Sequence, residues 1–225
     1  LTLDPSADRI HPGVAPGLMA GNPVAEEMLE AALMRPPDFI VNTVLTPGND
    51  LAGVFAGDMR AAHEAACALA ARIYRRDIRE KADLVIASAG TASNWIQSHK
   101  ALFNAHLALK PGGRIVLLAP CPEGIGNDRF GYWVTRPGIA DIYAGLRKNP
   151  EVLGQTALST RLRGPGTILV TRMPASDARD LGIRTAPDPD AAVRAALDDL
   201  RAAGVRNPTC WIMPEALYTV PAADR

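Results

Sequence analysis

Three polar side chains in residues 93–113, SNWIQSHKALFNAHLALKPGG, have the spacing of one helical face. Gln97, Lys100 and Asn104 follow one another at intervals of three and four residues, so a helix would place them on the same side. Glutamine both donates and accepts hydrogen bonds, while lysine is a compact cation that pairs well with a carboxylate. With the positive end of the helix dipole nearby, this face suits a small carboxylic acid or a phosphate. Alternatively, it is only the solvated side of an amphipathic helix.

The surrounding sequence predicts a strand–helix–strand unit that would position this face. The apolar segments DLVIASAG (83–90) and GRIVLLAP (113–120) flank the helix, a pattern typical of two parallel strands joined by a crossover. Ligands of open α/β sheets bind beyond the carboxyl ends of the strands, where the loops SAGTASN (88–94) and APCPEGIGN (119–127) follow. Gln97 and Lys100 lie in the first two helical turns after the first loop, within reach of a ligand there.

The rest of the chain also alternates between helices and strands. Asn22 caps a helix that starts at Pro23, and DFIVNTVL (38–45) and LAGVFAG (51–57) read as an antiparallel strand pair. Residues 58–82 read as one long Ala-rich helix, the kind that often bridges two domains. Residues 121–133 form a loop, GTILVTRM (166–173) a strand, residues 189–204 a helix, and residues 209–220 a last strand and loop. The predicted class is α/β with a mostly parallel C-terminal part.

Composition excludes some classes of partner. The chain has 24 Lys and Arg against 24 Asp and Glu, so no net field attracts nucleic acid or an anionic membrane surface. Cys67, Cys121 and Cys210 lack metal-ligand spacing and read as reduced thiols, mostly core filler, in a cytoplasmic protein. No apolar run approaches the roughly 20 residues of a membrane span. The chain lacks an initiator Met, and we expect it to be a fragment of a longer protein.

Other chemistries remain open from these residues alone. The segment LKPGGRIVL also occurs late in many S-adenosylmethionine methyltransferases, but IASAGTASN lacks the G-x-G that those enzymes need after an earlier strand. A methyltransferase-like domain is therefore an alternative, and a non-catalytic binding module is another. The four histidines have no metal-site spacing, and packed or surface roles suit them better.

Seven segments in order resemble the nickel-pincer lactate racemase family. These segments are GNPVAEEMLEAA, DFIVNTVL, VFAGDMRAAHEAAC, DLVIASAG, IQSHKALFNA, LKPGGRIVLLAPCPEGIG and MPEALYTVP. The resemblance implies that residues 1–57 are the last part of the family's N-terminal cofactor-binding domain, residues 58–82 an interdomain helix, and residues 83–225 a C-terminal α/β lid domain. It also implies an isomerase that racemises or epimerises small 2-hydroxy acids by hydride transfer at the carbinol carbon.

The same resemblance assigns site residues and a cofactor. The family's Gln-x-x-Lys pair matches Gln97 and Lys100, which would act on the substrate as catalytic residues, and Ser88 and Gly90 would contact the nickel-pincer nucleotide. The lysine that anchors this cofactor and the histidine that ligates nickel have no counterpart here, so the chain supplies no metal ligand. The resemblance therefore implies that the N-terminal domain is missing and that this chain alone is inactive. Many members hold a tryptophan near the substrate, for which Trp95 and Trp133 are candidates.

Overall fold

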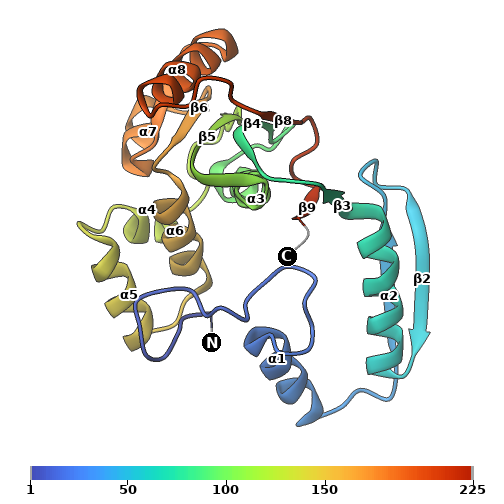
Figure 1. Ribbon diagram of the computed structural model, residues 1–225. Coiled ribbons are helices and arrows are strands. Elements are labelled where there is room, and N and C mark those ends of the chain that lie inside the picture. Colours follow the sequence, from blue (N-terminus) through green and yellow to red (C-terminus); the bar gives the residue numbers. More distant parts are fainter. Residues whose placement is uncertain (1, 224–225) are drawn as a thin grey trace. The chain divides into compact units, whose positions relative to one another are not determined.

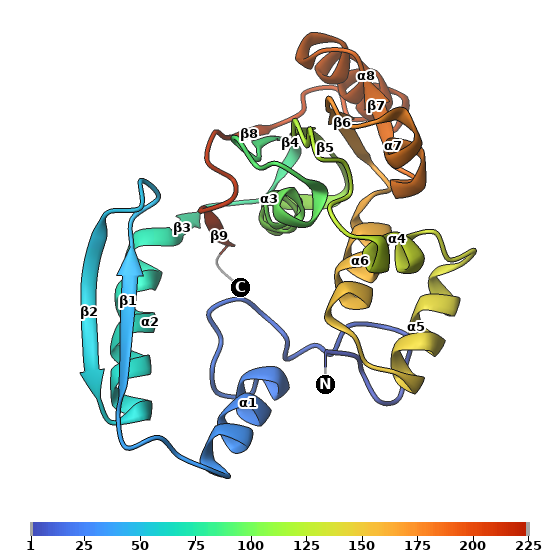
Figure 2. The ribbon, with the colours of Figure 1, turned by 180° about the vertical axis from the view of Figure 1, so that it is seen from behind.

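The computed structural model describes residues 2–223, which divide into two compact units (Figures 1 and 2). The first unit ends at Arg75, and the second begins at Arg76. The elements of the first unit are α1 Pro23–Leu33, β1 Ile40–Leu45, β2 Leu51–Gly57 and α2 Met59–Tyr74. As predicted, Asn22 caps α1 with Pro23 at the first helical position, and β1 pairs with β2 antiparallel. Helix α2 packs against this hairpin.

A parallel sheet of five strands, in the order β7-β6-β5-β4-β8, organises the described part of the second unit. Its strands are β4 Ala82–Ser88, β5 Leu109–Leu118, β6 Thr167–Val170, β7 Arg184–Ala186 and β8 Cys210–Met213. The helices are α3 Trp95–Leu107, α4 Asp128–Val134, α5 Ile139–Lys148, α6 Val152–Arg163, α7 Ala175–Leu181 and α8 Pro189–Ala202. The predicted α/β class with a mostly parallel sheet is confirmed.

Both faces of this sheet are buried along its central strands β4, β5 and β6. Leu84, Val116 and Ile168 point to one face and pack against α8. The alternate residues, such as Val85 and Leu117, are equally buried, and α3 packs against β4 and β5. Helices α4, α5 and α6 pack on one another beside the sheet (Figures 1 and 2). The apolar runs that predicted the strands are therefore those of a sheet covered on both sides.

The predicted long helix 58–82 is wrong beyond Tyr74. Arg75 has extended backbone angles, and residues 75–78 form strand β3 Arg75–Ile78, which pairs with β9 Val220–Ala223. The sequence RRDIREKA favours a helix locally, but pairing with a strand from the far end of the chain overrides that preference. The assignment of residues 1–57 and 83–225 to two family domains stays a prediction.

The predicted loop 121–133 is also wrong in its second half. Asn127 accepts a hydrogen bond from the backbone N–H of Arg129 and starts α4, which buries Phe130 and Trp133. The buried side chains of Phe130 and Trp133 anchor this helix to the core.

Candidate functional site

The two predicted ligand loops meet at the carboxyl ends of β4 and β5. The backbone N–H of Glu123 donates to the carbonyl of Ser93 (2.9 Å), and the Ser93 hydroxyl donates to the Glu123 carboxylate (2.8 Å). The N–H of Trp95, the first residue of α3, donates to the carbonyl of Gly124 (2.9 Å). These bonds fix the start of α3 against the second loop, and sequence reasoning did not single out Ser93 or Glu123.

A close approach at Gly126 strengthens this junction. A Cβ at Gly126 would lie 2.6 Å from Cγ of Asn94, and the φ angle of +88° also favours glycine. Asn94 is the N-cap of α3, where its side chain accepts from the N–H of Gln97 (3.2 Å). An asparagine directly before an apolar helical pattern is a recognisable cap signal that could have identified it from sequence.

Gln97 and Lys100 lie on the exposed side of α3. The Lys100 ammonium donates to the side-chain oxygen of Gln97 (3.1 Å), so the amide and the cation form a pair that a ligand can contact. The common face expected for these two residues is present in the structure. Their catalytic role stays a prediction.

Asn104, the third residue of the predicted face, has a different role. It is buried, and its amide N–H donates to the carbonyl of Ala216 (2.7 Å) in the loop after β8. The N–H of Ala216 in turn donates to the carbonyl of Ser88 at the end of β4 (3.1 Å). Asn104 therefore joins α3 to that loop and is unavailable to a ligand.

Ser88 and Gly90 form a small turn at the end of β4. The N–H of Gly90 donates to the Ser88 hydroxyl (3.0 Å), and Gly90 has a φ angle of +56°. A Cβ at Gly90 would meet no described atom within 4 Å, so this backbone is open to an approaching group. Contact with a cofactor stays a prediction for both residues.

Trp95 and Trp133, the candidates for a substrate-facing tryptophan, belong to the core instead. Trp95 is 0% exposed, and its indole N–H donates to the hydroxyl of Thr160 (3.1 Å). Trp133 is 2% exposed and donates to the Glu151 carboxylate (2.9 Å). Neither ring is placed to contact a bound substrate.

His99 packs in the protein as a neutral group. Arg163 donates to the Ser159 hydroxyl (2.6 Å), so that hydroxyl directs its own proton to Nε2 of His99 (2.8 Å). Burial, and then the positive charge of Arg163, lower the pKa of His99 to about 4. His99 is therefore uncharged near neutral pH, as a packed histidine should be.

Cys121 also fits the role of core filler. It is fully buried beside the hydroxyl of Ser98 (Oγ–Sγ 3.1 Å), and burial raises the pKa of its thiol. Residues 2–223 contain no group of three or more His, Cys, Asp or Glu side chains that could hold a metal ion. Within the same residues, every helix is too short or too polar to cross a membrane.

Curated relatives share sequence with about half of the chain. It is 31% identical over 126 residues to a lactate racemase of Thermoanaerobacterium thermosaccharolyticum, a match that covers 55% of this chain and 29% of the relative. It is 30% identical over 122 residues to a lactate racemase of Lactiplantibacillus plantarum, covering 53% of this chain and 28% of the relative. The match thus spans less than a third of each relative's length. No protein-family model matches the chain.

Solved structures share its fold. The lactate racemase apoprotein from T. thermosaccharolyticum superposes with a TM-score of 0.81 at 21% identity, covering 94% of this chain and 52% of that one. A protein from Thermotoga maritima gives a TM-score of 0.57 at 12% identity, over 91% of this chain and 54% of that one. From the sequence matches and this fold together, the chain is related to the lactate racemase family.

Proposed function

We propose that this chain is part of a racemase or epimerase of small 2-hydroxy acids, with Gln97 and Lys100 of α3 acting on the substrate. The observation that carries the proposal is the exposed Lys100–Gln97 pair near the start of α3, at the carboxyl edge of the sheet, in a chain related to lactate racemases. That edge is where ligands of open α/β sheets bind.

Each residue of the pair suits one part of a 2-hydroxy acid. The Lys100 ammonium can form a charge-assisted hydrogen bond with the substrate carboxylate. The side-chain oxygen of Gln97 accepts a hydrogen bond from the Lys100 ammonium, which leaves the amide N–H groups of Gln97 to donate to the hydroxyl or carboxylate of the acid. Because Asn94 and the second loop fix the start of α3, both side chains project from a rigid support.

The cofactor that the family resemblance implies fits this chain only in part. Residues 2–223 provide no cluster of metal ligands, so nickel would have to be held by other residues. The backbone at Gly90 is open to an approaching group, and Lys100 offers a positive charge to an anionic group of the cofactor. Hydride transfer at the carbinol carbon is the chemistry that this cofactor would supply when bound. Gln97 and Lys100 would hold the acid in one orientation.

The test begins with the DNA upstream of the Leu1 codon. An open frame that encodes the cofactor-anchoring lysine and a nickel-binding histidine would support the proposal, and the encoded protein should then interconvert the two enantiomers of lactate or of a related acid. Chiral chromatography of the product measures this directly. A stop codon, or a complete protein that binds hydroxy acids without turnover, would favour the non-catalytic binding module instead.

The methyltransferase alternative predicts a separate result. It requires saturable binding of S-adenosylmethionine to this chain, measured by calorimetry. The loop after β4, residues 89–94, lacks the second glycine of the G-x-G pattern. We therefore expect calorimetry to show no saturable heat of binding for S-adenosylmethionine.

A further inference from the structure

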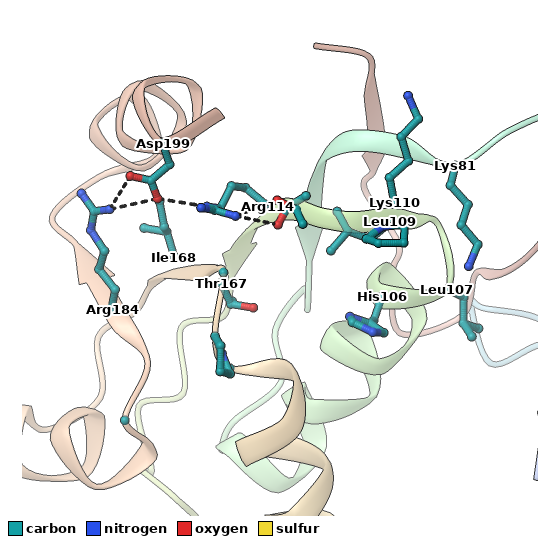
Figure 3. A pocket seen from close by; sticks show the side chains of 17 residues that line it. Lys81, His106, Leu107, Leu109, Lys110, Arg114, Thr167, Ile168, Arg184 and Asp199 are labelled. Atoms are coloured by element: carbon teal, nitrogen blue, oxygen red, sulfur yellow. Dashed lines mark hydrogen bonds and ion pairs between the residues drawn. The ribbon is translucent and has the colours of Figure 1, made fainter. Parts of the chain in front are cut away.

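A cavity of about 830 Å³ lies at the amino ends of β5, β6 and β7, the sheet edge opposite the candidate site. Much of its wall is formed by the bulged start of β5 at residues 111–113, the turn 164–166 and the last residues of α3. Clefts of this volume hold small metabolites. Figure 3 shows Arg114, Asp199 and Arg184 on one side, with Thr167 below Arg114, and Lys81, Lys110 and His106 on the other.

Positive charge exceeds negative charge on the first side. The Asp199 carboxylate bonds to Nε of Arg114 (3.0 Å) and to a terminal nitrogen of Arg184 (3.3 Å). The Arg114 guanidinium also donates to the carbonyl of Gly112 (2.8 Å), so its position is fixed. One carboxylate shared by two guanidinium groups leaves this side with a net positive charge.

The second side also carries excess positive charge. Lys110 is paired with Asp83 (3.0 Å), whereas Lys81 is exposed and forms no ion pair with the residues that the structure describes. Desolvation lowers the pKa of His106, and the positive charges of Arg163 and Lys81 lower it further. On this side of the cavity, the charge of Lys81, which has no ion-pair partner among the described residues, therefore acts on the imidazole of His106.

The negative C-terminal ends of nearby helices do not by themselves explain the excess of positive charge around the cavity. Helices α3, α6 and α8 end near this edge, and each end carries about half a negative charge, which favours nearby cations. At the end of α6, however, the Thr167 hydroxyl already donates to the Arg163 carbonyl (2.9 Å), and the Gly164 N–H donates to the Thr160 carbonyl (2.7 Å). Lys81 lies just before β4 and outside any helix.

Part of the cavity wall is apolar. Leu107, Leu109 and Ile168 contribute aliphatic surface, and Gly112 in the β5 bulge and Gly166 in the turn adopt φ angles of +78° and +84°. Because glycine has no Cβ, these two segments leave backbone accessible to a ligand. The cavity thus combines cations with apolar wall, which fits an anion that carries a carbon skeleton.

We propose that this cavity binds a small phosphorylated metabolite, with its phosphoryl group between Lys81 and His106 and its carbon skeleton against Leu107 and Leu109. A phosphoryl dianion complements the excess positive charge and accepts hydrogen bonds from several donors at once. The site is separate from the one formed by Gln97 and Lys100 and does not depend on the function proposed for that pair.

The test is a titration of the 225-residue chain with inorganic phosphate and with glycerol 3-phosphate, followed by NMR of the histidine rings. A His106→Asn variant assigns the His106 signal. Bound phosphate should move this signal saturably and raise the pKa of His106, because a nearby negative charge favours the protonated ring. Glycerol 3-phosphate should bind more tightly than inorganic phosphate because it also contacts the leucines.

Single-lysine variants locate the binding. Lys81→Ala should weaken phosphate binding about two- to fivefold, the range for one exposed ion pair. Lys148→Ala, on α5 and outside the cavity, and Lys100→Ala should leave it unchanged; melting curves verify that each variant is folded. Three results would overturn the proposal. Phosphate binding could weaken equally in Lys81→Ala and Lys148→Ala, or weaken only in Lys100→Ala. Sodium chloride at matched ionic strength could also produce the same shift of the His106 signal.

Discussion

Residues that look equivalent in the sequence have different roles in the structure. Gln97, Lys100 and Asn104 share helical spacing, yet the first two are exposed and paired, while Asn104 is buried against the carbonyl of Ala216. Spacing along one helix predicts which residues share a side. It cannot predict what covers that side, because the covering loop comes from the far end of the chain.

Lys100→Ala in the catalytically complete protein should lower kcat/KM for the 2-hydroxy acid about ten- to 150-fold. This range corresponds to the loss of about 1.5–3 kcal/mol, typical of a hydrogen bond to a charged group. Steady-state racemisation rates measure it, with Lys148→Ala as the control for removing an exposed lysine. Near-normal kinetics in Lys100→Ala would refute the role proposed for this residue.

Asn104→Ala should destabilise the second unit by about 1–3 kcal/mol, because it leaves the Ala216 carbonyl without its partner. Gln97→Ala, on the same helix but exposed, should change stability by less than about 0.5 kcal/mol. Urea unfolding followed by tryptophan fluorescence separates the two, since Trp95, Trp133 and Trp211 all lie in this unit. Equal effects would mean that the Asn104 bond contributes little.

Acid should destabilise the second unit through His99. Its pKa is about 4 when folded and about 6.5 when unfolded, so between these values the unfolded chain binds the extra proton. Stability is therefore full above pH 6.5 and falls as the pH drops toward 4, by about 3 kcal/mol at most. Urea unfolding at several pH values should show a shallower decline in His99→Gln than in wild type, and an unchanged decline would contradict this.

At the scale of elements, apolar runs predicted most of the sheet but not every helix. The sequence predicted β4, α3 and β5 because two apolar segments flank an amphipathic one. Helix α6 was not predicted, because Gly154 and its Ser and Thr residues are weak helix formers. A Cβ at Gly154 would lie 2.8 Å from the Trp133 ring, so close packing against α4 stabilises this helix. Contacts between distant segments also set the end of α2: the helix stops where β3 pairs with β9, although the local sequence favours a helix.

Gly126→Ala should destabilise the loop junction more than Gly204→Ala destabilises the end of α8. Both glycines have nearly the same φ, +88° and +86°, so both substitutions carry a strain of about 1–2 kcal/mol. Only the Cβ at Gly126 also collides with a described side chain, that of Asn94. Urea unfolding compares the variants. Equal losses would indicate that Asn94 moves away without consequence for α3.

At the scale of the whole molecule, the predicted fold class was correct, while the candidate site was predicted only in part. The loops after β4 and β5 and the pair on α3 were located from sequence because parallel strands end at one edge. The bonds between Ser93 and Glu123, and the burial of both candidate tryptophans, depend on contacts between distant segments. No local pattern encodes such contacts.

Residues 76–225 should fold without the first unit, since the five-stranded sheet and the helices on its two faces all lie within them. Expressed alone, this segment should keep the tryptophan fluorescence and the urea midpoint measured for the second unit in the longer chain. An aggregated product, or a midpoint lowered by more than the error of the measurement, would show that the first unit contributes to its stability.

The edge strand β8 has a consequence for how the protein is made. It pairs with β4, although more than a hundred residues separate the two along the chain. On the ribosome, β4 and α3 must therefore wait for β8 and Ala216 to emerge, with one sheet edge uncovered and Asn104 unsatisfied meanwhile. Slower synthesis would lengthen the time for which this edge is exposed to neighbouring chains, so aggregation during expression should increase when translation is slowed between β4 and β8.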